Sequence, residues 1–388
     1  MCPLRVAVVF GTRPDAVKMA PVMLELARDA RFECVPIATG QHREMMDDVL
    51  ALFGIAPEHD LEVMTEGQSL TDVTTRVLER LGPVLGDVRP DTVLVHGDTT
   101  TSTAAALASY YKKIPVGHVE AGLRTDTIYE PFPEEMNRRL TGVLATHHFA
   151  PTPTARENLL REGKDPHSIV VTGNTVIDAL LWMHGRTTAG DAPAVATQRM
   201  IFVEAHRREN LGEPLEAICR ALRSVVKRHE DVSVLWPVHQ NPEVVETVRR
   251  ILDGQPRVHL VPPMSYRSLV GAIGRCTLVA TDSGGLQEEA PCLGKPVLVL
   301  RRVTERPEGV AAGTLRLIGT QEAAVAAALD ELLDDPAAYA HMAHAANPYG
   351  DGQAARRIAD ALWAFHRNGA LPDEFDPSRP PTLPSAAR

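Results

Sequence analysis

Three carboxylic acid side chains stand where a parallel α/β protein places its reactive groups. Asp98 and Glu120 directly follow strand-like apolar runs, and Glu134 lies in the first turn of a later predicted helix. Each has a structural alternative, because Asp98 could cap a helix and Glu134 could simply favour the helix dipole. Carboxylates crowded into one cleft would raise one another's pKa, which suits proton transfer near neutral pH. We therefore take Asp98, Glu120 and Glu134 as candidate acid/base residues.

A strand-to-helix turn near the N-terminus could hold an anion. The stretch Gly11–Lys18 carries Arg13 and Lys18 beside the free N–H groups expected at a helix start. It matches neither the dinucleotide-binding pattern nor the P-loop pattern, so those two functions are not predicted. The alternative is a glycine turn with a solvent-facing arginine.

A second such turn occurs late in the chain, at Ser283–Gly285. Two glycines at a strand end would present backbone N–H groups to an anion. Glu289 lies one turn into the following helix and could accept hydrogen bonds from ribose hydroxyls. Thr281 occupies the place of the first glycine of a hydrolase elbow, so a nucleophilic serine is not expected.

Two charged loops complete the candidate residues. His206 is followed by two arginines after a buried strand, which indicates contact with a pyrophosphate, and Arg306 lies in a charged loop after the last clear strand. Taken singly, each is better read as a solvated surface loop.

The elements that must position these residues follow a strand–helix alternation that occurs twice. Such alternation predicts parallel sheets covered on both faces, with ligands bound at the carboxyl ends of the strands. The fold class is therefore α/β, with two units in tandem that face a cleft. The expected strands are Leu4–Phe10, Phe32–Ala38, Thr92–His96, Ile114–Val119, Met200–Glu204, Ser233–Val238, Val258–Val261, Thr277–Ala280 and Pro296–Leu300, and a short strand-like run contains His147 and His148.

The domain boundaries follow from the same pattern. The first domain is expected over residues 1–175, completed by a C-terminal helix around 350–368, and the second over 176–349. The stretch Thr187–Ala196 has linker composition. Residues 371–388 contain five prolines and are expected to be disordered.

Composition excludes several classes of function. The 388 residues carry 40 Lys and Arg against 50 Asp and Glu, a formal net charge of −10, which argues against nucleic-acid and membrane partners. Five cysteines form no metal-binding or disulfide pattern, so neither a metal nor a cofactor is expected and a cytoplasmic location is the simple interpretation. No signal peptide or membrane span is evident.

The motifs in order resemble those of the non-hydrolysing UDP-N-acetylglucosamine 2-epimerases. The matching stretches, between about Leu4 and Phe365, are GTRPDAVKMAPV, TGQHREMMDDVL, HGDTTT, VEAGLRT, PFPEEMNRR, GNTVIDAL, HRREN, PVHQNP, DSGGLQEEAP and TERPEGVAAGT. The resemblance implies two Rossmann-like domains in the GT-B arrangement. It also implies reversible C2 epimerisation of UDP-N-acetylglucosamine to UDP-N-acetylmannosamine, by anti elimination of UDP to 2-acetamidoglucal and re-addition. A homodimer is expected on the same basis.

Carried over by motif, the resemblance implies roles for individual residues. Asp98, Glu120 and Glu134 would handle the proton at C2, with the base among them left open, and His206 would attend the departing UDP. The substrate-binding residues would be Arg13, Lys18, Arg138, His206, Ser283, Gly284, Gly285, Glu289 and Arg306.

The sequence departs from the family pattern at some positions. Asp15 stands where the family usually has Glu, Ala205 where it usually has Thr, and Arg302 where an acidic or polar residue is common. Glu44 and Gly67 stand where members with an allosteric second substrate site often have Gln and Arg. Because that arginine would contact a phosphate, we predict weak or absent substrate activation. The candidate allosteric residues are Gln41, Glu44, Arg207 and His239.

Other functions remain open at this point. A GT-B glycosyltransferase would share the nucleotide site but would need an acceptor and would not need Asp98, Glu120 and Glu134 together. A hydrolysing 2-epimerase would release free N-acetylmannosamine and UDP, and those enzymes often carry a kinase domain. A catalytically inactive nucleotide-sugar sensor would have no use for the retained carboxylates and His206.

Overall fold

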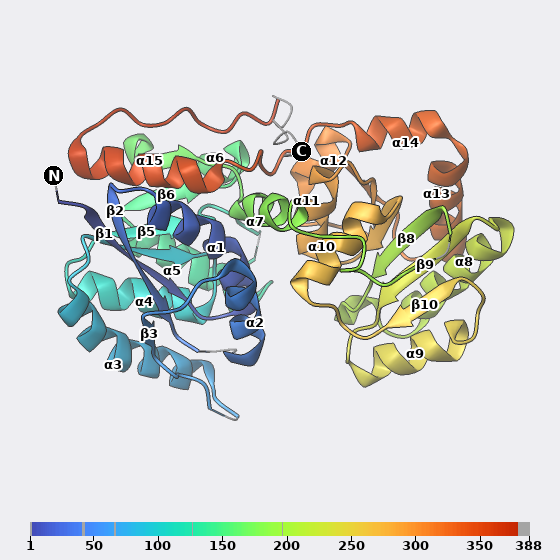
Figure 1. Ribbon diagram of the computed structural model, residues 1–388, viewed down its shortest axis with the longest axis horizontal. Coiled ribbons are helices and arrows are strands. Elements are labelled where there is room, and N and C mark those ends of the chain that lie inside the picture. The colour runs from blue at the N-terminus through green and yellow to red at the C-terminus, as the bar shows by residue number, and fades with distance from the viewer. Residues whose placement is uncertain (1, 41–42, 66, 126, 196, 379–388) are drawn as a thin grey trace. The chain divides into compact units, whose positions relative to one another are not determined.

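The computed structural model divides the chain into two compact units. It describes residues 2–40, 43–65, 67–125, 127–195 and 197–378, with the side chains of 43–45 also outside the description. Within the described residues, unit 1 comprises residues 2–179 and Tyr349–Asp376, and unit 2 comprises Leu180–Pro348 with Pro377 and Ser378. Each unit contains one parallel sheet with helices around it, which confirms the predicted tandem of α/β units (Figure 1).

Unit 1 is built on a seven-stranded parallel sheet in the order β3-β2-β1-β4-β5-β6-β7. Its central strands are runs of apolar side chains buried on both faces, as parallel sheets require. The strands are β1 (Leu4–Phe10), β2 (Phe32–Ala38), β3 (His59–Asp60), β4 (Thr92–His96), β5 (Val116–Val119), β6 (His147–Ala150) and β7 (Ile169–Val171). The helices are α1 (Arg13–Arg28), α2 (Arg43–Phe53), α3 (Leu70–Val88), α4 (Thr100–Tyr111), α5 (Glu134–Leu144), α6 (Pro153–Arg161), α7 (Thr175–His184) and α15 (Ala354–Arg367).

Helix α15 returns from the C-terminal part of the chain to unit 1, where it packs beside α1 (Figure 1). The carboxylate of Asp178 caps its N-terminus by accepting hydrogen bonds from the backbone N–H groups of Ala354 (3.2 Å) and Ala355 (2.8 Å). Burial raises the pKa of Asp178 to about 7. On the opposite end of the helix, the ring of Phe365 stacks on His147 of β6 at 4.0 Å between centroids.

The structure differs from the prediction that residues 371–388 are disordered. Phe375 is buried, and its backbone N–H donates to the carbonyl oxygen of Val171 at 2.8 Å. Glu374 accepts a hydrogen bond from the Val171 N–H and forms an ion pair with Arg156. This segment is therefore held along β7 despite its prolines, because its contacts are tertiary. Residues 379–388 lie outside the described residues.

Unit 2 is built on a six-stranded parallel sheet in the order β10-β9-β8-β11-β12-β13. The strands are β8 (Arg199–Glu204), β9 (Val232–Pro237), β10 (Val258–Val261), β11 (Leu278–Thr281), β12 (Val297–Val299) and β13 (Leu315–Leu317). The helices are α8 (Glu213–Arg228), α9 (Pro242–Leu252), α10 (Tyr266–Arg275), α11 (Gly284–Cys292), α12 (Pro307–Ala312), α13 (Glu322–Asp334) and α14 (Pro336–Ala343).

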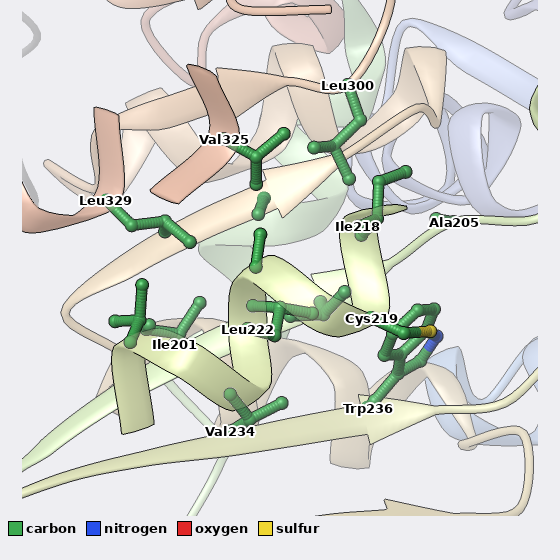
Figure 2. Packing of buried hydrophobic residues seen from close by; sticks show 14 of the residues in the cluster. Ile201, Ala205, Ile218, Cys219, Leu222, Val234, Trp236, Leu300, Val325 and Leu329 are labelled. Atoms are coloured by element: carbon green, nitrogen blue, oxygen red, sulfur yellow. The ribbon is translucent and has the colours of Figure 1, made fainter. Parts of the chain in front are cut away.

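One face of the unit 2 sheet forms a close-packed core with α8 and α13. Leu222 of α8 lies over the strands, and Trp236 of β9 packs beside Cys219 (Figure 2). Leu329 of α13 belongs to the same cluster of buried side chains (Figure 2). The first turn of α8 is acidic and its last turn is basic, as the helix dipole favours. The rigid core fixes the carboxyl ends of β8 and β11, from which the loops described below emerge.

Candidate active site

The carboxyl ends of β1, β4 and β5 position the candidate residues of unit 1. These strands are neighbours in the sheet, so the loops that follow them meet at one edge. Lys18 comes from the helix after β1, Asp98 from the turn after β4, and Glu120 is the first residue after β5. Topology thereby brings together side chains that are far apart in the sequence.

Glu120 is held as a carboxylate in a strained backbone position. Its φ angle is +62°, in the left-handed region that non-glycine residues rarely adopt and that concentrates at functional sites. Its Oε2 atom accepts hydrogen bonds from Nζ of Lys18 at 2.5 Å and from Nδ2 of Asn174 at 2.8 Å. Burial alone would raise the pKa of Glu120, but the neighbouring Lys18 and His96 outweigh it and lower that pKa well below its usual range.

Asp98 shows the opposite pKa shift. Its carboxylate pairs with the guanidinium of Arg138, and its backbone carbonyl accepts a hydrogen bond from Nδ2 of Asn137 at 3.0 Å. Burial nevertheless raises the pKa of Asp98, with the negative charge of Glu120 adding to the effect and Arg138 opposing it. Two carboxyl groups with oppositely shifted pKa values are the arrangement that lets one donate a proton and the other accept one.

The expectation that the carboxylates raise one another's pKa is therefore wrong for Glu120. Lys18 of α1 lies 2.5 Å from its carboxylate oxygen, and Nε2 of His96 lies 3.8 Å from the same oxygen. Glu134 lies half-buried at the start of α5, one turn before Arg138. Within the described part of the chain it has no hydrogen bond or ion pair with Asp98 or Glu120.

In unit 2, the loop after β8 carries His206 and is held by a buried carboxylate. Asp282, directly after β11, accepts hydrogen bonds from the backbone N–H groups of His206 and Arg207, each at 2.9 Å. It also accepts one from Nδ2 of Asn210 at 2.9 Å. The ring of His206 stacks on His239, with centroids 4.8 Å apart. Burial lowers the pKa of His206, so the ring is a neutral imidazole at pH 7.

The start of α11 has the geometry expected of an anion-binding site. A Cβ atom added to Gly284 would lie 3.7 Å from Nη2 of Arg207 and 3.8 Å from Nη2 of Arg306, so two guanidinium groups flank the first helical turn. Glycine leaves the backbone N–H groups open to a ligand there, and the helix dipole adds positive potential. Arg306 also pairs with Glu288.

Glu289 lies one turn further along α11 and is buried. Its Oε1 atom accepts a hydrogen bond from the hydroxyl of Tyr266 at 3.2 Å, which fixes the side chain. A Cβ atom on Gly285 would lie 3.7 Å from its other oxygen. The carboxylate therefore stands beside the anion site, where it could accept hydrogen bonds from a sugar.

Comparison with known proteins identifies the family. A sequence profile described as UDP-N-acetylglucosamine 2-epimerase matches residues 24–363. The enzyme of that name from Salmonella typhimurium is 51% identical over 372 residues, which cover 93% of this chain and 99% of the relative. The one from Bacillus subtilis is 51% identical over 369 residues, covering 94% and 96%. This chain belongs to the UDP-N-acetylglucosamine 2-epimerase family.

The fold agrees with that membership. The crystal structure of the Neisseria meningitidis UDP-GlcNAc 2-epimerase bound to UDP-GlcNAc superposes with a TM-score of 0.84 at 45% identity, covering 92% of this chain and 99% of that one. The chain accordingly has the GT-B-like fold of the family, made of two Rossmann-like units.

The structure adds residues that the motifs alone did not mark. Asp282 lies inside a recognised motif, but only the fold places it under the His206 loop. Lys18, predicted to bind substrate, forms an ion pair with Glu120 in this structure. His96 and Asp15 form part of the same network, as described below. A signal for Asp282, His96 and Asp15 would have been a charged side chain close to the end of a strand whose other residues are apolar.

The structure describes only some of the predicted allosteric residues. Arg207 lies beside Gly284 and His239 lies against His206, so both belong to the surroundings of the anion site. Gln41 and the side chain of Glu44 lie outside the described residues. Gly67 is exposed, with open space where a Cβ would be.

Neither a metal-binding cluster nor a membrane-spanning helix is found in the described ranges. No group of three or more His, Cys, Asp or Glu side chains there has a metal-binding arrangement. None of the helices in the same ranges is both long and apolar enough to cross a bilayer.

Proposed function

We propose that the chain interconverts UDP-N-acetylglucosamine and UDP-N-acetylmannosamine, by anti elimination of UDP and its re-addition. In the forward step the C2–H bond breaks, its electrons form the C1–C2 double bond of 2-acetamidoglucal, and the C1–O bond breaks to release UDP. Re-addition of UDP at C1 with a proton delivered to the other face of C2 gives the epimer. Family membership supports this reaction, as does the UDP-GlcNAc bound by the Neisseria meningitidis relative.

The opposite pKa shifts of Asp98 and Glu120, which follow the neighbouring strands β4 and β5, are the feature that carries the proposal. Glu120, ionised and held by Lys18, serves as the base that takes the C2 proton. Asp98, whose pKa burial raises, is assigned as the group that returns a proton to the other face. In the reverse direction the two exchange roles, as microscopic reversibility requires. Glu134 is the third member of this acid/base group by motif, and Arg138 orients Asp98.

The leaving nucleotide is assigned to unit 2. The open N–H groups of Ser283, Gly284 and Gly285, together with Arg306, would stabilise the negative charge that develops on the departing pyrophosphate. Glu289 would accept hydrogen bonds from the ribose, and His206 would contact the phosphate. Arg13, Lys18 and Arg138 of unit 1 complete the proposed substrate-binding residues.

Proton NMR with UDP-N-acetylglucosamine in deuterium oxide, without an acceptor sugar, tests the proposal. The expected result is an equilibrium mixture of the two epimers with deuterium at C2 and no free sugar. Glu120→Gln and Asp98→Asn are expected to lose about 10²–10⁴-fold in kcat, the usual contribution of a positioned acid or base. Glu162→Gln, which removes the carboxylate of an ion pair with Arg124 elsewhere in unit 1, serves as the control.

The same experiment separates the alternatives. Release of free N-acetylmannosamine would indicate a hydrolysing enzyme. Absence of both epimer and deuterium incorporation, with turnover restored by an acceptor, would indicate a glycosyltransferase. Absence of any turnover with retained nucleotide binding would indicate a sensor.

Substrate activation is proposed to be weak or absent, since Gly67 presents no cation to a second phosphate. A hyperbolic rate curve from pure UDP-N-acetylmannosamine is expected. A lag that traces of UDP-N-acetylglucosamine relieve would contradict it.

A homodimer and a cytoplasmic location are also part of the proposal. Tyr110, Tyr111 and Val143 expose large apolar surfaces at the ends of α4 and α5, beside a groove of about 480 Å³ that a second copy could cover. All five cysteines are free thiols, which agrees with a reducing compartment. Light scattering at micromolar concentration tests the dimer, with a monomer mass as the contrary result.

A further inference from the structure

His96 is a fully enclosed histidine placed between two carboxylates of unit 1. It ends β4, and its Nδ1 atom lies 3.3 Å from Oδ1 of Asp15 in α1. Its Nε2 atom lies 3.8 Å from Oε2 of Glu120 and makes no hydrogen bond within the described part of the chain. One ring thus connects the start of the first helix to the proposed C2 base.

Asp15 is held in place by hydrogen bonds that do not involve His96. Its carboxylate accepts hydrogen bonds from the backbone N–H groups of Gly11 (3.4 Å) and Thr12 (3.2 Å), as part of the capping box of α1. A carboxylate satisfied by N–H donors at a helix N-terminus is an acceptor only. The Nδ1 atom of His96 must therefore carry a hydrogen toward Asp15.

The state of the other ring nitrogen follows from what it faces. A lone pair on Nε2 would point at the negatively charged oxygen of Glu120, whereas an N–H would be attracted to it. The other titratable groups around the ring are Lys18 of α1, which opposes a positive charge on it, Asp98 just after its own strand, and His118 of the neighbouring β5, whose pKa burial lowers to about 3. Burial would lower the pKa of His96, but Glu120 and Asp15 together raise it to about 9.

We propose that His96 is a positioning residue that, oriented by Asp15, stands as an imidazolium beside Glu120 and keeps this base ionised. The inference rests on the proposed function, because it concerns the working pH range of Glu120. Lys18 alone would leave the base dependent on one flexible side chain that the substrate's phosphates could attract away. A cation built into the central strand cannot be drawn away in that manner.

Histidine titration by NMR tests the charge directly and without any turnover. With ¹⁵N-labelled histidine, one imidazolium is expected to persist at pH 7.5 in the wild type and to be missing in His96→Gln. In Glu120→Gln the same ring is expected to become neutral at pH 7.5. A wild-type His96 that is neutral at that pH would overturn the proposal, whatever the enzyme's activity.

The pH dependence of kcat/KM tests the consequence for catalysis. Removing a neighbouring positive charge raises the pKa of a carboxylate, so the acid limb of His96→Gln should move to higher pH by about 1–3 units. The KM at the pH optimum should change little, because His96 is not assigned to substrate contact. An unmoved acid limb, or an activity loss that is equal at all pH values, would mean a purely structural role.

Two further variants serve as controls. His148→Gln removes a buried histidine of β6 whose pKa burial lowers to about 4, and it should leave the acid limb in place. Asp15→Glu keeps the carboxylate that orients the ring and should retain the wild-type profile, whereas Asp15→Asn should shift it in the direction of His96→Gln. If the wild type shows no epimerisation, the proposed function fails, while the NMR titration still decides the state of His96.

Discussion

The sharpest prediction concerns Asp282, the buried carboxylate beneath the His206 loop. Its Oδ2 atom accepts three hydrogen bonds at 2.9 Å, from the backbone of His206, the backbone of Arg207 and the side chain of Asn210. Its side chain is 0% exposed. In Asp282→Asn the new NH₂ group carries no charge and cannot accept, so the loop loses charge-assisted bonds and buried donors lose their partner.

The size of the effect can be worked from these bonds. A hydrogen bond to a charged group contributes about 1.5–3 kcal/mol, so three independent bonds would sum to roughly 5–9 kcal/mol. They share one acceptor, and the asparagine oxygen can still accept some of them, so the sum is an upper limit. We expect a loss of about 3–5 kcal/mol in the unfolding free energy of unit 2.

Urea denaturation of the full chain, followed by tryptophan fluorescence, measures this loss, because Trp182 and Trp236 lie in unit 2 and Trp363 lies in unit 1. Steady-state kinetics are expected to show an increased KM for the nucleotide sugar, because the loop also carries Arg207 beside Gly284. Asp231→Asn is the matched control, because that carboxylate of the same unit pairs with Arg199 near the surface and should cost less than about 1 kcal/mol. If Asp282→Asn lowers the unfolding free energy no more than this control does and keeps the wild-type KM, then Asp282 does not hold the His206 loop as described.

Two other predictions follow from the packing of unit 1. Gly122→Ala should cost more than about 3 kcal/mol, because its φ is +91° and a Cβ would lie 2.2 Å from the carbonyl oxygen of Ala155. Gly163→Ala, with φ +78° and open space around it, should cost only about 1–2 kcal/mol by the same thermal melt; equal costs would contradict the clash. Because burial raises the pKa of Asp178 to about 7, its stabilising contribution is complete below pH 4 and is lost as the pH rises through 7. Asp178→Asn, which keeps a capping oxygen, should therefore gain stability relative to wild type between pH 5 and 8 in urea titrations; a constant difference would be the contrary result.

Much of the fold could be predicted from the local pattern. The central strands of both sheets are long apolar runs, so their positions followed from the sequence to within a few residues. The strands β3, β7 and β13 were missed because they have only two or three residues, too few to carry a pattern. The ordered backbone around Phe375 was also not predicted, because the burial of this residue depends on its contact with β7.

Part of the candidate site could be predicted for the same reason. Asp98, Glu120 and Ser283–Gly285 directly follow predicted strands, and parallel sheets place ligands at those ends. Their ionisation could not be predicted, because a carboxylate's pKa depends on which charges lie within a few ångströms. Crowded carboxylates were expected to raise one another's pKa, which holds for Asp98 and fails for Glu120.

Local periodicity and contiguous motifs were enough to predict the class of fold, the family and the positions of the reactive side chains. The charges on those side chains depend on the folded arrangement. Lys18 and Glu120 are 102 positions apart, yet their atoms meet at 2.5 Å, and His96 reaches the same oxygen from a third element. Electrostatic interactions depend on distance through space and on burial, and neither is written in the order of the residues.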